Sequence, residues 1–518
     1  MPHPRETAQV NPHKPAIIMG DSGEMVTYRQ LDERSNQGAQ LFRALGLGKG
    51  DHLALMLENR REFLEICWAA QRAGVIYTPI SSHLKADETA YILENCGASL
   101  FITSAAMADV ASQALESAPG VRHRLMLSGI RDGFDSWEES VDAQPPTPID
   151  DEANGMPMLY SSGTTGKPKG VYIPPESDAV DTPHPLAATL GAAFGFGPET
   201  TYLSPAPLYH AAPLHYNLMN LFLGGTSVVM ERFDPERALA LMEEHRATHS
   251  QWVPIMFVRM LKLPAEVRER YDVSAMQVAI HAAAPCPIEV KEQMIAWWGP
   301  IIFEYYGASE GIGFALIDST QWLEHKGSVG RAVVGVAHIV DDEGRELPAG
   351  EIGTVYFSGD QARFEYHDEP EKTAGSFNEA GWATVGDVGY LDDEGYLYLT
   401  DRKHFTIISG GVNVYPQEVE NLLITHDKVA DVAVFGVPDE EFGETVQAVV
   451  QPRNWADATD EVAFELLEWL RGRLSGIKVP KAIDFRQDLP RLDNGKLYKR
   501  HLMEEYRGAA RADSDEGR

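Results

Sequence analysis

Tyr160 to Val171 reads YSSGTTGKPKGV, and this run of hydroxyl, glycine and lysine residues is the most informative stretch of the chain. Backbone N–H groups in a glycine-rich turn can form a nest for an anion, and Ser and Thr hydroxyls add donors to phosphate oxygens. It is not a Walker A loop, because Gly163 and Gly166 are too close together for GxxxxGK[ST] and Pro168 discourages an immediate helix. We therefore expect a triphosphate loop of another kind, with Ser161, Ser162, Gly163, Thr164, Thr165, Lys167 and Lys169 as candidate ligands.

Length and composition predict a multidomain globular protein. A chain of 518 residues corresponds to about three folding units. Its hydrophobic fraction of 44% and charged fraction of 23% are ordinary for a packed protein. The net charge of -33 argues against a nucleic-acid partner, since binding the phosphate backbone requires clustered Lys and Arg.

Cysteine usage and hydropathy predict a cytoplasmic location. Cys67, Cys96 and Cys286 are an odd, widely spaced set that fits neither a disulfide framework nor a CxxC metal site. The N-terminal residues are polar, and no run approaches the ~18 apolar residues that span a bilayer. We therefore expect a reducing compartment and no transmembrane segment. The oligomeric state is left open, with a homodimer as one option.

The periodicity of the first half predicts α/β layering. Helix-like segments at 31–44 and 61–73 alternate with strand-like runs at 52–56 and 75–79. Over residues 381–401 the pattern changes to strand-like runs separated by an Asp-Asp-Glu-Gly turn, which is typical of antiparallel hairpins. The following unit mixes helices and strands in a compact α+β pattern. We expect a large domain over 1–401, a small domain over 402–506 and a disordered tail over 507–518.

The loop at Tyr160 resembles the phosphate-loop signature of the adenylate-forming superfamily, which includes acyl-CoA synthetases, luciferases and the adenylation domains of peptide synthetases. Upstream, Val26 to Leu31 (VTYRQL) and residues 50–80 resemble the N-terminal motifs of that family. The resemblance extends from about Pro12 to Met503, which is nearly the full chain. It implies a large AMP-binding domain of layered α/β subdomains with a hairpin-rich segment, followed by a small mobile α+β domain.

Further motifs follow in the order of the family. His281 to Pro287 (HAAAPCP) is similar to the segment that lines one face of adenine, which assigns Ala283, Ala284 and Pro285 to the nucleotide. Tyr305 to Gly311 (YYGASEG) resembles the motif in which Tyr306 stacks on adenine, Ser309 contacts the α-phosphate and Glu310 holds Mg²⁺, with Tyr305 and Gly307 beside them. The resemblance also assigns Thr164 to the metal and Thr165 to catalysis. The family more often has Thr at the position of Ser309, but the hydroxyl is retained.

The hinge and the small domain carry the remaining motifs. Asp387 lies in VGD where the family usually reads TGD, and its carboxylate can accept hydrogen bonds from both ribose hydroxyls. Asp401 and Arg402 resemble the hinge Asp and the ribose-contacting Arg. His404 and Phe405 depart from the charged pair that often follows, so no nucleotide contact is assigned to them.

Two motifs lie in the small domain. Gly411 belongs to a segment that resembles the loop bordering the pantetheine channel. Lys496, after an Asp-Asn-Gly turn, resembles the lysine that enters the site for adenylation.

The resemblance implies a two-step reaction that uses ATP, Mg²⁺ and coenzyme A. A carboxylate is converted to an acyl-adenylate, and after a rotation about Asp401 a thiol takes the acyl group. The alternatives are an amine acceptor, a luciferase reaction, or a non-catalytic binder of nucleotide or acyl groups. A carrier-loading domain is less attractive because no carrier domain follows Lys496.

The resemblance assigns the acyl pocket to Tyr209, His210, Trp252, Ala282 and Tyr305, which favours a hydrophobic monocarboxylic acid of fatty, alicyclic or aryl type. His210 could instead be a gating or packing residue.

Overall fold

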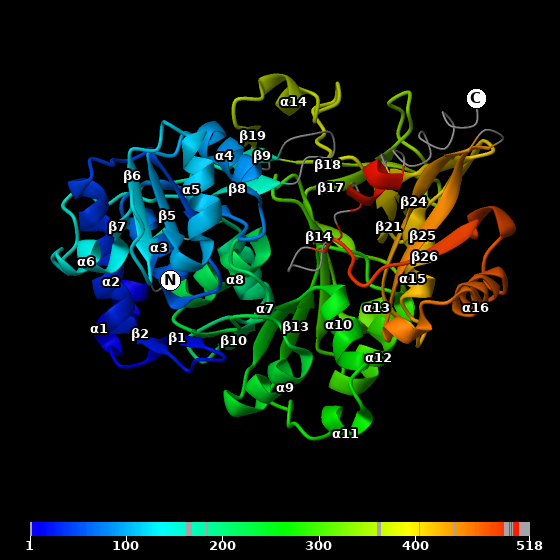
Figure 1. Ribbon diagram of the computed structural model, residues 1–518, viewed down its shortest axis with the longest axis horizontal. Coiled ribbons are helices and arrows are strands. Elements are labelled where there is room, and N and C mark those ends of the chain that lie inside the picture. Colours follow the sequence, from blue (N-terminus) through cyan, green and yellow to red (C-terminus); the bar gives the residue numbers. More distant parts are fainter. Residues whose placement is uncertain are drawn as a thin grey trace.

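The computed structural model describes residues 3–161, 168–182, 185–359, 364–402, 405–439, 442–491, 497, 499 and 501–506. The expected disordered tail over 507–518 lies outside them. The described chain forms a large N-terminal part built on several sheets, which runs from blue to yellow in Figure 1, and a small C-terminal part, mainly orange, at the right-hand side of that view. The predicted α/β fold class is confirmed. No helix of the described ranges has the length and apolar character needed to cross a membrane.

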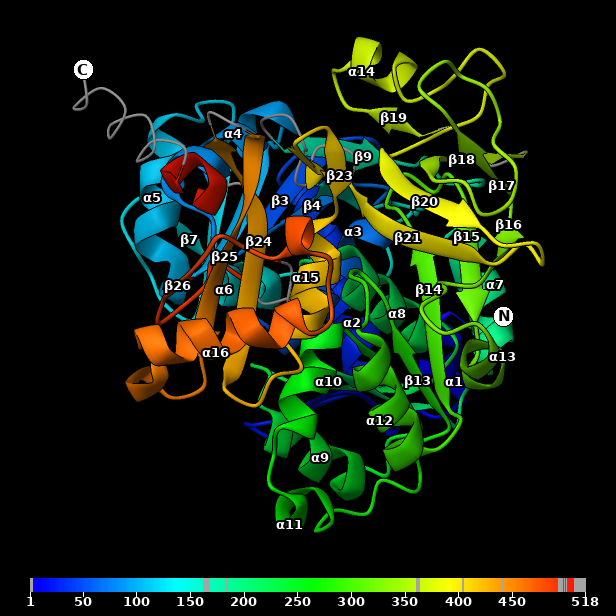
Figure 2. The same cartoon turned by 90° about the vertical axis from the view of Figure 1, so that its right-hand side faces the viewer.

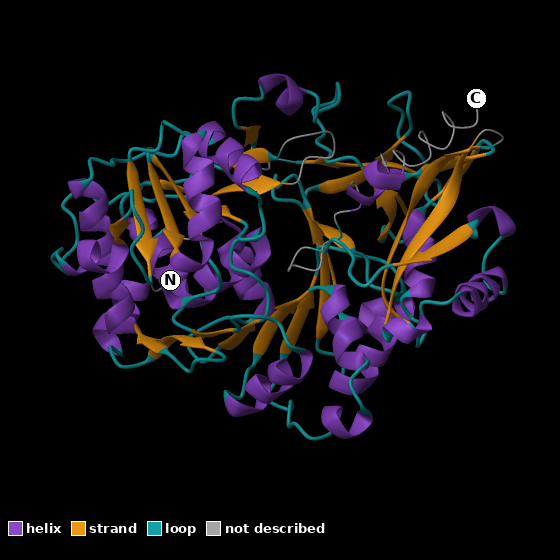
Figure 3. Cartoon of the chain, viewed as in Figure 1, coloured by secondary structure: helices purple, strands orange, loops and turns teal. Residues whose placement is uncertain are grey.

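One sheet of the large part is parallel and five-stranded, in the order β4-β3-β5-β6-β7. Its strands and helices are β3 (His52–Met56), β4 (Ile76–Ile80), β5 (Leu100–Ser104), β6 (His123–Leu127), β7 (Asp135–Ser136), α2 (Tyr28–Ala44), α3 (Arg61–Arg72), α4 (Ala86–Asn95), α5 (Ala108–Glu116) and α6 (Trp137–Asp142). Successive strand residues point to opposite faces. Leu53 and Leu55 accordingly join the core under α2 and α3, while Ala54 and Met56 join the core under α4 and α5. Helices cover both faces of this sheet (Figure 3).

The predicted helix over 31–44 is observed as α2, which begins three residues earlier. Thr27 Oγ1 accepts a hydrogen bond from the backbone N–H of Gln30 at 3.3 Å, and Gln30 Oε1 accepts one from the backbone N–H of Thr27 at 2.9 Å. This reciprocal capping box satisfies two backbone donors that the first turn of a helix leaves unpaired. The apolar periodicity marks only the buried stripe of the helix, so it misses the capped first turn.

A nine-stranded sheet in the order β16-β15-β14-β13-β12-β10-β11-β1-β2 forms the middle of the molecule. Its strands are β1 (Pro15–Met19), β2 (Met25–Thr27), β10 (Thr201–Ser204), β11 (Thr226–Val229), β12 (His249–Trp252), β13 (Val278–His281), β14 (Ile302–Gly307), β15 (Phe314–Ile317) and β16 (Arg331–Val334), and its helices are α7 (Pro185–Phe194), α8 (Ala211–Phe222), α9 (Pro235–Glu244), α10 (Pro254–Leu261) and α12 (Ile288–Trp298). Tyr202 and Ile280 enter the core shared with α8, while Leu203 and Ala279 enter the core shared with α9, α10 and α12. The sheet is therefore covered by helices on both faces.

Two small antiparallel sheets complete the large part. One has the order β19-β9-β8 and the other β17-β18-β20-β21. Their elements are β8 (Met158–Ser161), β9 (Lys169–Tyr172), β19 (Glu365–Tyr366), β17 (Val336–Val340), β18 (Gly353–Ser358), β20 (Asp387–Leu391) and β21 (Leu397–Arg402). Strands β20 and β21 are the hairpin predicted within 381–401. The remaining short helices are α1 (Pro4–Val10), α11 (Ala265–Arg268), α13 (Ser319–Glu324) and α14 (Pro370–Ala374).

The small part is an α+β unit around the long hairpin of β24 and β25. Strand β26 pairs with β25 in parallel, and β22 pairs with its other end. The elements are β22 (Ile407–Ser409), β23 (Val412–Val414), α15 (Pro416–Leu423), β24 (Val429–Asp439), β25 (Gly443–Pro452), α16 (Asp460–Arg471) and β26 (Ala482–Phe485). Helix α15 packs against β24 and α16 against β26 (Figure 2).

Candidate active site

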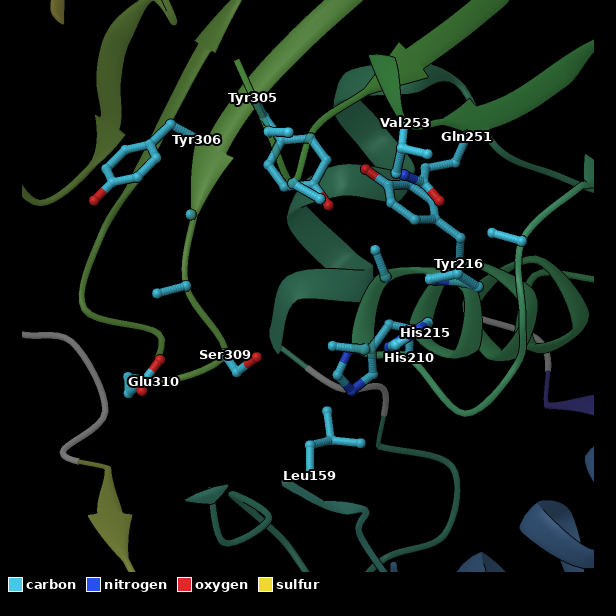
Figure 4. A pocket seen from close by; sticks show the side chains of 18 of the residues that line it. Leu159, His210, His215, Tyr216, Gln251, Val253, Tyr305, Tyr306, Ser309 and Glu310 are labelled. Carbon is cyan, nitrogen blue, oxygen red and sulfur yellow. The ribbon is translucent and has the colours of Figure 1, made fainter. Parts of the chain in front are cut away.

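A cavity of about 710 Å³ is lined by residues from both parts of the chain. Its walls come from β8 and β9, from α8, β12 and α10, from β14 and the loop after it, and from the start of β20. The small part contributes residues of α15 and of the C-terminal segment, including Glu420, Arg491 and Lys499. Residues far apart in sequence are thus brought to one cavity, part of which is shown in Figure 4.

Strand β14 divides the cavity into two sides, because Tyr305 and Tyr306 point in opposite directions (Figure 4). Tyr305 stacks on Phe314 with ring centroids 4.9 Å apart and lies 6.4 Å from the ring of Tyr216 on α8. The Tyr306 hydroxyl donates a hydrogen bond of 2.7 Å to Asp387 Oδ2 at the start of β20. The predicted adenine and ribose residues therefore touch each other on one side, and Tyr305 belongs to the other.

The loop after β14 carries the predicted metal residue. Gly307, Ser309 and Glu310 all line the cavity, and Glu310 is only 7% exposed. Glu310 Oε1 accepts a hydrogen bond of 2.9 Å from the hydroxyl of Tyr366 on β19. Tyr366 was not among the sequence candidates; only the pairing of β19 with β9 brings it beside this loop.

The hairpin of β8 and β9 frames the phosphate loop, with Ser161 opposite Lys169. Lys169 lines the cavity, and its Nζ lies 4.3 Å from the centroid of the Tyr366 ring. Burial lowers the pKa of Lys169 from its ordinary value, while the charge of Glu310 opposes that shift. The predicted loop residues Ser162, Gly163, Thr164, Thr165 and Lys167, and the side chain of Ser161, lie outside the described residues.

The segment after β13 also lines the cavity. Ala283, Ala284 and Pro285 line it. Ala283 has a φ of 75°, a left-handed conformation that costs a residue with a Cβ atom free energy. Ala282 is buried and donates its N–H to Trp252 O at 3.3 Å, so it lies behind this turn and not on the cavity.

The junction with the small part is also on the cavity wall. Asp401 lines it, and Asp401 Oδ2 accepts a hydrogen bond from the backbone N–H of Gln417 at 3.3 Å, at the start of α15. Arg402 pairs with Asp387 in the β20–β21 ladder, but its side chain lies outside the described residues. Gly411 does not line the cavity; it lies in the turn between β22 and β23 with a φ of 81°.

Lys496 lies outside the described residues, but the chain reaches the cavity on both sides of it. Arg491, Leu497 and Lys499 all line the wall. Lys499 Nζ is 2.8 Å from Glu420 Oε1 in a buried ion pair, and the same carboxylate oxygen accepts a hydrogen bond from the backbone N–H of Val434 at 2.7 Å. These contacts anchor the C-terminal segment on α15 and β24.

The side of the cavity beyond Tyr305 is mainly apolar. Tyr209 and His210 line it, with ring centroids 4.3 Å apart. Met219 and Leu159 add apolar surface, and Val253 faces the same space. Burial raises the pKa of the Tyr305 hydroxyl well above its ordinary value, which keeps it neutral.

Trp252 requires a correction, because it is fully buried away from the cavity. Its ring packs 5.6 Å from that of Trp298, and its Nε1 donates a hydrogen bond to Ser250 Oγ. Since strand neighbours alternate between faces, Gln251 and Val253 face the cavity in its place. The sequence run around Trp252 is apolar on both faces, so its composition alone did not indicate which residues turn inward.

A buried ion pair joins α12 to the cavity wall, which Glu304 itself lines. Lys291 Nζ on α12 is 2.6 Å from Glu304 Oε2 on β14, and Lys291 Nζ also lies 4.7 Å from the centroid of the Trp322 ring. His281 Nε2 is 3.5 Å from the same carboxylate oxygen. Burial raises the pKa of Glu304 and the Lys291 ammonium opposes that shift. The pair therefore fixes β14 against α12 directly below Tyr305.

Comparison with protein families identifies the class of this chain. Residues 4–367 match the family described as AMP-binding enzyme, and residues 418–496 match the AMP-binding enzyme C-terminal domain. The chain therefore belongs to the AMP-binding enzyme family, as the motif resemblance predicted.

Relatives and solved structures cover nearly the whole chain. The long-chain-fatty-acid–CoA ligase FadD13 of Mycobacterium tuberculosis is 33% identical over 509 residues, with 97% of each chain covered. The feruloyl-CoA synthase of an Amycolatopsis species is 33% identical over 499 residues, with 96% of each covered. The crystal structure of ATP-bound MatB from Rhodopseudomonas palustris is 30% identical, with a TM-score of 0.79 over 96% of this chain and 97% of that one. These curated relatives are acyl-CoA ligases, and their names differ in the acid.

Proposed function

We propose that this protein is an acyl-CoA synthetase that activates a hydrophobic monocarboxylic acid as an acyl-adenylate, with release of pyrophosphate, and then forms a thioester with coenzyme A. The observation that carries the proposal is one cavity with two chemically different sides. Tyr306, Asp387 and Glu310 lie on a polar side, and an apolar side is built on α8 and β12. The names of the relatives support coenzyme A as the acceptor.

On the polar side we assign the nucleotide. The Tyr306 ring stacks on adenine, with the backbone of Ala283, Ala284 and Pro285 on the other face. Asp387 exchanges its hydrogen bond with the Tyr306 hydroxyl for ribose hydroxyls, since a carboxylate has acceptor sites for several donors. The roles proposed for the other polar groups are phosphate contact for Ser161, Ser162, Gly163, Thr164, Thr165, Lys169 and Ser309, and ribose contact for Arg402.

The residues of the polar side have the ligand chemistry that Mg²⁺ requires. This ion is usually held by one or two carboxylates together with substrate phosphates. Glu310 supplies one buried carboxylate on the cavity wall, and Thr164 is the second protein ligand that we propose. When bound, the ion neutralises charge on the phosphates of ATP. Tyr366 holds Glu310 in place through their 2.9 Å hydrogen bond.

The first half-reaction joins two anions. A carboxylate oxygen of the acid attacks the α-phosphorus of ATP, and the bond to the bridging oxygen breaks as pyrophosphate leaves. Lys496 and the Thr165 loop offset the repulsion and hold the groups in line. Arg491, before Lys496 in the chain, and Leu497, directly after it, both line the cavity. Their positions support this role for Lys496.

The second half-reaction transfers the acyl group. The thiol sulfur of coenzyme A attacks the carbonyl carbon, AMP leaves with the electron pair, and the thiol proton is released. We propose that the chain turns at Asp401, between a domain over 1–401 and one over 402–506, which withdraws Lys496 and brings Gly411 to the site. The position of Gly411 away from the cavity supports the need for such a rotation.

The experiment measures pyrophosphate and product mass with ATP, Mg²⁺ and a panel of fatty, alicyclic and aryl acids, with and without coenzyme A. We expect an acyl-CoA from one class of acid, and much slower pyrophosphate release from Lys496→Ala. Lys481→Ala is the matched control, because Lys481 belongs to the same small part and is paired with Asp439 at 2.7 Å away from the cavity. Pyrophosphate without a thioester would indicate an amine acceptor. ATP binding without pyrophosphate across the panel would indicate a non-catalytic binder.

A further inference from the structure

On the cavity wall formed by α8 and β12, two buried polar atoms have no hydrogen-bond partner within the described chain. They are the hydroxyl of Tyr216 on α8 and Oε1 of Gln251 on β12. Tyr216 is 2% exposed and Gln251 1% exposed, and both line the cavity. Helix α8 packs against β12, and Figure 4 shows both side chains beside Tyr305 and Val253. Buried polar groups are nearly always hydrogen-bonded, so two such atoms on one wall point to a ligand.

The two atoms have complementary hydrogen-bonding capacity. Gln251 Nε2 donates to Trp252 O at 2.9 Å. Because a backbone carbonyl can only accept, this contact fixes the amide nitrogen on that side and leaves Oε1 as an acceptor. Burial raises the pKa of Tyr216 well above its ordinary value, so its hydroxyl stays neutral and can donate. The wall therefore offers one acceptor and one donor.

The residues around these two atoms argue against a second charged group on the bound acid, besides the carboxylate that reacts. The cavity-lining residues of α8, β12 and α10, all of which the structure describes, include no Lys or Arg. A carboxylate or phosphate placed there would lose its hydration without gaining a permanent countercharge, which is costly. A neutral group that both donates and accepts loses little, because each of its hydrogen bonds with water is replaced.

We infer that the acyl pocket selects a carboxylic acid that carries a neutral hydroxyl group, which donates to Gln251 Oε1 and accepts from the Tyr216 hydroxyl. This inference rests on the proposed function and narrows its hydrophobic acid to a hydroxylated one. A phenol on an aryl acid and an alcohol on an aliphatic acid share this chemistry. An acid without the hydroxyl leaves both atoms unpaired, which is the situation in which enzymes discriminate most strongly.

The test compares matched pairs of acids that differ only in one hydroxyl. One arm uses cinnamic acid against 4-hydroxycinnamic acid, and the other uses decanoic acid against 10-hydroxydecanoic acid. The readouts are kcat/KM for pyrophosphate release and, separately, Kd from calorimetry with each acid. We expect the hydroxylated member of one pair to be favoured by about tenfold or more in both, since a tenfold preference corresponds to about one hydrogen bond. The arm that shows the preference identifies the phenol or the alcohol.

Tyr216→Phe removes the donor alone, so its ratio of hydroxylated to plain acid should fall about tenfold. Gln251→Met removes the acceptor and should reduce the same ratio. Tyr202→Phe is the matched control, because Tyr202 is a buried tyrosine 6.1 Å from the Tyr216 ring that does not line the cavity. The ratio is insensitive to partial unfolding, which lowers both activities together.

Equal use of both members of each pair by the native protein, or an unchanged ratio in Tyr216→Phe, would overturn the inference. If no acid in either pair releases pyrophosphate, the proposed function fails for these acids. The calorimetric ratios still decide the inference in that case, because they depend on binding and not on turnover.

Discussion

Glu65 lies buried on α3 in an environment that disfavours its charge. Its Oε1 has no hydrogen-bond partner in the described chain, and the nearest cation is Arg61, whose Nη1 is 4.0 Å away. Arg34, Glu62 and Glu138 line the same small pocket. Burial, with a smaller contribution from the charge of Glu62, raises the pKa of Glu65 to about 7. We predict that Glu65→Gln stabilises the protein, and more so as the pH rises.

The sign and size follow from the two protonation equilibria. The folded protein binds this proton more tightly than the unfolded chain, whose Glu has a pKa of 4.5. Glu65 therefore costs nothing below pH 4.5, and its ionisation lowers the free energy of unfolding as the pH rises from 4.5 through 7. Raising a pKa from 4.5 to about 7 corresponds to roughly 3 kcal/mol. Glu65→Gln should gain up to roughly that amount at pH 8 and almost nothing near pH 4.5.

The assay is urea denaturation of both proteins at intervals between pH 5 and pH 8. Glu62→Gln, on the same helix, is the control, because we expect it to change the free energy of unfolding in the opposite direction. Burial raises the pKa of Glu62, but the hydrogen bond and charge of Arg60 outweigh burial and lower it, so removing that carboxylate should destabilise the protein at neutral pH. If the Glu65→Gln and native stabilities run parallel over the whole range, the reasoning about Glu65 is refuted.

Three further changes test the site and its supports. Tyr366→Phe deletes the donor to Glu310, so the rate of pyrophosphate release should fall roughly tenfold and the Mg²⁺ requirement should rise; an unchanged Mg²⁺ titration would contradict this. Ala283→Gly removes a Cβ atom from a left-handed residue and should raise the free energy of unfolding by about 1 kcal/mol in urea. Lys291→Met leaves Glu304 buried without its cation and should cost about 3–5 kcal/mol, while a neutral result would show that the pair is dispensable.

Much of the fold could be predicted from local patterns. The alternation of apolar periods over 31–80 predicted α2, β3, α3 and β4, because a helix or strand buries residues at its own repeat. The Asp-Asp-Glu-Gly turn predicted the hairpin of β20 and β21 in the same way. The start of α2 was missed because the cap that sets it, between Thr27 and Gln30, is polar and leaves no mark in the apolar pattern.

The sequence by itself determined the class of chemistry, because glycine, hydroxyl and carboxylate residues in YSSGTTGKPKGV and YYGASEG are suited to phosphate and metal wherever the chain places them. Only the tertiary structure decided which residues share the cavity. It brought Tyr366 to Glu310 through the pairing of β19 with β9, and it turned Gln251 toward the cavity and Trp252 into the core beside Trp298. These choices depend on strand register and on packing between distant segments, and neither is encoded in the residues next to the site.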